Sequence, residues 1–175
     1  MQKQDEASVE NSILLPMLKR AISFLSDDLG VAVISHSQEI TSPNKIELRK
    51  NTAMIGTGGS VQVLITMGYD DVLLEKLMKA FLEGEEVDEE EIDEVRESVS
   101  SEVINTIVGN ALVNPIDGTA LSITPPILIY EAKSLFKNKS SRIAAATIST
   151  EFGDMLLTVV GPKESFVNAL NFKEL

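Results

Sequence analysis

Four positions between residues 98 and 109 have the side-chain types and the spacing to meet a partner and take part in chemistry. Ser98, Glu102, Asn105 and Gly109 follow one another at intervals of four, three and four residues, which aligns them along one side of an α-helix. We call these four positions the seam. A carboxylate can pair with a cation, and a carboxamide can donate one hydrogen bond while it accepts another. The pattern fits either an ordinary exposed strip or a docking ridge that inserts Asn105 and presents Glu102 to a partner.

The helix that carries the seam is predicted from its apolar residues. On one face they recur at helical spacing, and in the second half further apolar residues widen that face well past one stripe: Ile92, Val95, Val99, Val103 and Ile107, then Ile104, Val108 and Ala111. We expect this helix to end near Val113, before Asn114-Pro115. Gly109 costs such a helix about 1 kcal/mol relative to alanine, and its missing side chain leaves open surface beside Asn105.

An acidic window from Glu83 to Glu97 is predicted to open this helix. The chain has 175 residues and a net charge of −12, and ten acidic residues opposed by Arg96 give the window −9 of it. The negative charge argues against nucleic acid and anionic membranes as partners. Carboxylates near a helix N-terminus also stabilise the helix dipole. Because Glu91 and Glu94 extend the seam, we expect part of the charge to steer a positively charged partner.

Counting removes several kinds of chemistry. The chain has no cysteine and a single histidine, His36, so thiolate nucleophiles, disulfides and His-rich zinc sites are excluded, and no metal site is predicted. The glycine cluster at 56–59 lacks a following Lys-Ser/Thr pair and precedes a strand, which favours a hairpin over a phosphate loop. No secretion signal and no apolar run of membrane-spanning length is visible. We therefore expect a cytoplasmic protein with no membrane span.

The remaining patterns predict an α+β fold. Strands are predicted at 30–40, 45–55, 60–67, 119–123, 127–130, 142–149 and 154–160, and further helices at 11–29, 72–82 and 163–171, with Asp70 and Asp71 capping the second of these. Residues 52–77 and 147–170 both read as a hairpin followed by a helix. We expect one domain over 1–175, with 1–10 a flexible tail, in which an antiparallel or mixed sheet packs on two long helices in pseudo-two-fold halves. Chance similarity of two hairpin-helix units is the alternative.

The sequence resembles the CheC/CheX chemotaxis phosphatase family. The resemblance rests on Ser98-x-x-x-Glu102-x-x-Asn105 within the run 102–110, on Pro125-Pro126 downstream, and on the context at 68–87 and 150–159. It extends from about residue 11 to 170. The first predicted helix has no Glu-x-x-Asn motif, so the single motif is most similar to CheX. That likeness implies a homodimer.

What the resemblance implies is hydrolysis of an aspartyl phosphate on a response regulator such as CheY, in chemotaxis or two-component signalling. Asn105 would be catalytic and orient the attacking water, and Glu102 would pair with the lysine of the regulator. From their places on the seam and its acidic extension, Ser98, Gly109, Glu94 and Glu91 are predicted to contact the partner. No cofactor of its own is implied, because magnesium would be held by the regulator.

Two other functions stay open at this point. One is a binding module of the same fold that docks a receiver domain or a flagellar switch component without turnover. A small-molecule site in a groove of the sheet is a third candidate, but no residue pattern supports it.

Overall fold

The computed structural model describes residues 13–39, 43–59, 62–113 and 121–163, and its main layer is a six-stranded sheet. In sheet order its strands are β1 (Val33–Glu39), β7 (Ser141–Thr150), β8 (Gly153–Pro162), β4 (Leu64–Tyr69), β3 (Asn51–Gly56) and β5 (Ile127–Ile129). Every neighbouring pair is antiparallel. Two short strands, β2 (Lys45–Glu47) and β6 (Ser134–Phe136), pair separately. The predicted α+β class is confirmed.

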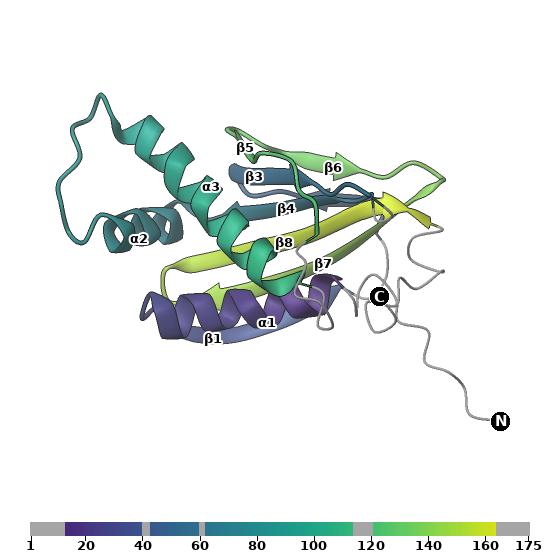
Figure 1. The fold of residues 1–175 in the computed structure, drawn as a ribbon, viewed down its shortest axis with the longest axis horizontal. Helices are drawn as coiled ribbons and strands as arrows, with labels where there is room; N and C mark the ends of the chain where they lie inside the picture. The colour runs from purple at the N-terminus through teal and green to yellow at the C-terminus, as the bar shows by residue number, and fades with distance from the viewer. Residues whose placement is uncertain (1–12, 40–42, 60–61, 114–120, 164–175) are drawn as a thin grey trace.

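In the described residues three α-helices pack with the sheet, and Figure 1 shows α3 running diagonally across it and α1 lying beside β1 and β7. They are α1 (Leu15–Ser23), which continues as the π-helical turn η2 (Phe24–Asp28), α2 (Asp71–Phe81) and α3 (Ile92–Ala111). The α1–η2 segment and α3 correspond to the two long helices expected from the sequence, and α2 is a shorter third. Pro16 lies in the first turn of α1, where its missing N–H costs nothing.

The main core fills the space between the helices and one face of the sheet. Alternate strand residues point into it, among them Ile65, Met67 and Tyr69 of β4, because successive side chains of a strand face opposite sides. Val103 and Ile107 of α3 are fully buried in the same core. Because Val103 and Ile107 are buried, the opposite face of α3 must point away from the core.

The two hairpins predicted to be related meet at the centre of the sheet. The β3–β4 and β7–β8 hairpins pair through β4 and β8, and Ile65 lies opposite Val159. Antiparallel pairing of these two corresponding strands is the arrangement that a two-fold axis between the hairpins produces. The pseudo-two-fold arrangement is confirmed for the hairpins. The predicted helix at 163–171, like the predicted tail at 1–10, falls outside the described residues.

Several predicted elements differ from the structure. The predicted strand 45–55 is broken at residues 48–50, and its two parts join different sheets. In the predicted strand 119–123, Ile123 forms only an isolated bridge with Thr57, and 119–120 lie outside the described residues. The acidic window was expected to open the helix, but α3 begins at Ile92, so most of the window is the loop that precedes it.

Asp70 was predicted to cap α2 with its side chain, and that prediction is wrong. Asp70 is the N-cap residue, but its carboxylate makes no capping hydrogen bond. It accepts a hydrogen bond from the backbone N–H of Asp154 at 2.8 Å and pairs with Arg49 Nε at 3.2 Å. The Asp70 carboxylate is therefore bound by β8 and by Arg49, which are distant in the sequence, and not by the first backbone N–H groups of α2.

Candidate active site

The seam lies on the outer side of α3, opposite the core. Ser98 and Glu102 are exposed, and Asn105 and Gly109 are half-buried. Val103 and Ile107, on the other side of the helix, are inaccessible to solvent. Glu102 and Asn105 are therefore presented by a helix that is fixed to the sheet along its opposite face, which satisfies the first requirement of a docking ridge.

The carboxylate of Glu102 has a neighbour that sequence reasoning missed. Thr106 Oγ1 donates a hydrogen bond to Glu102 Oε1 at 3.3 Å, one helical turn away. The i,i+4 spacing from Glu102 was the signal in the sequence that pointed to this contact. The hydrogen bond uses one carboxylate oxygen, Oε1, and Glu102 remains exposed to solvent.

Gly109 leaves open surface beside Asn105, as its missing side chain predicts. A Cβ atom built on Gly109 would meet no other group within 4 Å, although the residue is part of a regular helix. The backbone of α3 is thus accessible one turn beyond Asn105. A partner can approach the helix axis here more closely than at any position that carries a side chain.

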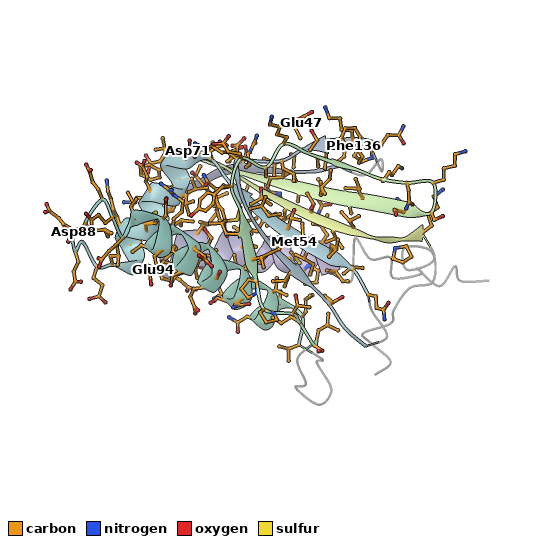
Figure 2. All side chains as sticks on the ribbon, turned by 90° about the horizontal axis from the view of Figure 1, so that it is seen from above. Glu47, Met54, Asp71, Asp88, Glu94 and Phe136 are labelled. Carbon is orange, nitrogen blue, oxygen red and sulfur yellow. The ribbon has the colours of Figure 1, made fainter. Side chains whose placement is uncertain are left out.

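Glu91 and Glu94 lie where the sequence placed them, toward the N-terminal end of the seam, and both are exposed. Figure 2 shows Glu94 projecting from α3 and Asp88 projecting from the loop before it, at the same end of the molecule. Glu94 belongs to the first helical turn, where a negative charge also favours the helix dipole. Dipole stabilisation and partner steering are compatible roles for this residue.

The N-terminal part of α3 is held against β5 and the turn after it. Tyr130 Oη donates a hydrogen bond to the backbone carbonyl of Asp93 at 3.1 Å, and Arg96 pairs with the Asp93 carboxylate at 2.7 Å. The Arg96 guanidinium also lies over the Tyr130 ring, 5.9 Å from its centre. These contacts fix the start of the helix that carries the seam. Sequence reasoning did not single out Tyr130.

The other features considered in the sequence do not join the seam. His36 is an exposed residue of β1, at the edge of the sheet. The glycine cluster begins at the last residue of β3, Gly56, and continues into the connection to the antiparallel strand β4, so its interpretation as a hairpin is confirmed. No group of three histidine, aspartate or glutamate residues that could hold a metal ion occurs in the described residues, and no described helix is long and apolar enough to cross a membrane.

Comparison with known proteins now identifies the family. The sequence profile described as Chemotaxis phosphatase CheX matches residues 51–148, more than half of the chain, so the chain belongs to the CheX family. By sequence alone, no curated protein matches it.

Solved structures support the same fold. The chemotaxis protein CheX from Desulfovibrio desulfuricans superposes with a TM-score of 0.67 at 18% identity, covering 83% of this chain and 95% of its own. CheX from Vibrio vulnificus gives 0.65 at 16% identity, with 85% and 95% covered. A CheX–CheY–BeF3–Mg2+ complex from Borrelia burgdorferi gives 0.62 at 23% identity, with 85% and 96% covered.

Proposed function

We propose that this protein is a phosphatase that removes phosphate from the active-site aspartate of a CheY-like response regulator in the cytoplasm. The observation that carries the proposal is the placement of Glu102 and Asn105 on the outer face of α3, in a chain of the CheX family. Burial of both residues in their own core would have argued against it. One structural neighbour is a complex of CheX with CheY, BeF3 and Mg2+, which supports a receiver domain as the partner.

The reaction needs little covalent help from the protein. A water oxygen attacks the phosphorus, the bond from phosphorus to the aspartyl oxygen breaks, and the products are an aspartate carboxylate and inorganic phosphate. Phosphoryl transfer depends chiefly on positioning and electrostatics. In our proposal the Asn105 carboxamide accepts a hydrogen bond from the water and donates another to an oxygen atom, fixing the line of attack without changing charge.

The other seam residues position the two proteins. Glu102 pairs with the active-site lysine of the receiver, and the hydrogen bond from Thr106 holds the carboxylate for this contact. Gly109 allows close approach of the partner, Ser98 borders the contact, and Glu91 and Glu94 attract it. We assign magnesium to the receiver, so that this chain supplies a carboxylate and a carboxamide and no metal ligand.

The test is the rate of phosphate loss from a phosphorylated CheY-like receiver. Asn105→Ala should lower the accelerated rate at saturating protein about 100-fold, the scale of losing one positioned polar group in a transition state. Glu102→Ala should chiefly weaken binding and keep most of the rate at saturation. Both residues lie outside the core, so thermal unfolding should remain close to that of the wild type.

The same helix offers matched controls. Glu97 lies five residues before Glu102 and Asn110 five residues after Asn105, each about 140° around the helix from its counterpart. Both are exposed. Glu97→Ala and Asn110→Ala should keep the wild-type rate and affinity. If the receiver binds but its phosphate decays no faster than without this protein, the second candidate is correct, a binding module that docks a receiver or a flagellar switch component without turnover.

We further propose that the protein is a homodimer, and β1 favours this. It is an edge strand that pairs with β7, it is largely exposed, and its Ile34 side chain is 70% accessible. Long exposed edge strands tend to pair with another chain unless they are protected. Ile34→Lys should convert a dimer to a monomer in light scattering. A wild-type protein that is monomeric at assay concentration would contradict the proposal.

A further inference from the structure

A groove lies between α2 and the loop that leads into α3, away from the seam. It has a volume of about 520 Å³ and is lined by the apolar side chains Met78, Leu82, Val87 and Ile92. Met78 is buried, Leu82 and Val87 are half-buried, and Ile92 is 37% exposed. These residues form an apolar surface that is partly open to water. Groups that can fill it would gain free energy by leaving water.

Carboxylates surround this apolar surface. Glu75, Glu85 and Glu86 line the groove beside one cation, Lys79. The acidic loop continues directly from Val87 into four further exposed acidic residues, 88–91. The groove and its border are therefore strongly negative, and an apolar occupant with positive charge on both sides complements them. An anionic or purely apolar occupant does not.

The loop that borders the groove is held in a defined conformation. Glu83 and Gly84 both have positive φ angles, 51° and 85°, and the backbone N–H of Gly84 donates to Lys79 O at 3.2 Å. The N–H of Glu85 donates to Leu82 O at 2.9 Å. A left-handed conformation at a non-glycine residue costs about 1–2 kcal/mol and persists only where the surroundings impose it. The start of the loop, at residues 83–85, is thus fixed against the end of α2.

We propose that this groove docks a basic amphipathic peptide segment of a partner protein, with one or two apolar side chains flanked by lysine or arginine. The apolar side chains enter between α2 and the loop, and the flanking cations meet Glu75, Glu85 and Glu86. Ile92 lies six residues before Ser98, the first position of the seam, which is about 9 Å along α3. The site is therefore distinct from the seam, and the proposal does not depend on phosphatase activity.

The test measures binding of the fluorescein-labelled peptide Lys-Lys-Leu-Phe-Lys-Lys by anisotropy at about 0.15 M salt. A peptide with both central residues replaced by serine has the same charge. The apolar peptide should bind about tenfold or more tightly than the serine peptide, because only it fills the groove. Equal binding of the two peptides, or no binding of the first up to about 1 mM, overturns the proposal.

Charge variants of the protein provide a second, independent arm. Glu85→Gln with Glu86→Gln should weaken binding about fivefold or more. Glu89→Gln with Glu90→Gln removes the same charge from the same loop, but outside the groove. This second double variant should weaken binding about twofold or less. Equal losses would mean long-range attraction alone and would overturn the proposal. Val87→Ser should also weaken binding, whereas Ile127→Ser, at an apolar residue that is 56% exposed on β5, should not.

Discussion

Asp70, at the start of α2, and Glu102, in the middle of α3, are both carboxylates, but their surroundings in the structure are opposite. Asp70 is joined to Arg49 and to the backbone of Asp154, which in turn accepts a hydrogen bond on its side chain from Arg49 Nη2 at 3.0 Å. Glu102 accepts a hydrogen bond at 3.3 Å from Thr106 of its own helix. The first carboxylate stabilises the fold by linking three segments. The second stays on an exposed face, where a partner can reach it.

Sequence patterns alone do not distinguish these two kinds of polar residue. A polar group whose hydrogen bonds are satisfied within the protein reports on stability, whereas one held on a rigid element without strong internal partners is available for recognition. Variants that change only one of these two regions should therefore affect stability and activity separately.

The largest expected effect is on the Asp70 side. Gly153→Ala should destabilise the protein by about 2–3 kcal/mol, because Gly153 has a φ of 114° and an added Cβ would lie 2.8 Å from Asp70 Cβ. Chemical denaturation measures the loss. Gly84→Ala is a control, since its φ is also positive but a Cβ there meets nothing within 4 Å, and it should cost less. Equal losses would show that backbone strain alone matters and that contact with Asp70 does not.

Tyr69, the residue before Asp70, should give a smaller effect of opposite sign. Its side chain is fully buried, and its hydroxyl has no hydrogen-bond partner among the described residues. Tyr69→Phe should therefore stabilise the protein by about 1 kcal/mol at neutral pH, because the desolvated hydroxyl is removed. Unfolding by urea in both proteins checks this. A loss of stability would mean that the hydroxyl has a partner.

The pH dependence of the same variant has a definite sign. Burial raises the pKa of the Tyr69 phenol above its usual range. Above about pH 10 the unfolded chain releases this proton while the folded protein keeps it. The free energy of unfolding is therefore unaffected by this titration below about pH 10 and decreases as the pH rises further. Tyr69→Phe should show a smaller alkaline loss than the wild type.

On the seam, Gly109→Ala should separate stability from activity. The added methyl group meets nothing within 4 Å, so the variant should gain about 0.5–1 kcal/mol from helix propensity. Receiver dephosphorylation should fall about tenfold, because the methyl group holds the partner away from Asn105. Asn110→Ala, which also raises helix propensity but lies off the seam, should gain stability without losing rate. An unchanged rate in Gly109→Ala would remove Gly109 from the contact.

The smallest expected effect is on steering. Glu91→Gln with Glu94→Gln should slow association with the receiver about two- to fivefold at low salt and flatten its salt dependence, because both residues are exposed at the N-terminal end of the seam. Stopped-flow binding at several salt concentrations measures this. If rate and salt dependence are unchanged, stabilisation of the helix dipole is the remaining role of these residues.

Much of the fold could be predicted because the signals are local. Alternating apolar residues define both hairpins of the central sheet, and helical periodicity defines α3 and its outward seam. The resemblance carried by Glu102 and Asn105 indicated the family that the profile match then established. What failed were features whose cause lies far away in the sequence, such as the break after β2 and the partners of Asp70.

The sequence by itself determined which residues of α3 face outward, because a helix that buries Val103 and Ile107 must expose Glu102. Only the tertiary structure decided which carboxylates remain free, because Asp70 meets a strand 84 residues further along the chain. The groove beside Met78 was likewise invisible, since its walls come from α2, the acidic loop and the start of α3. Periodicity acts between neighbours in the chain, whereas ion pairs and grooves depend on which distant segments the core brings together.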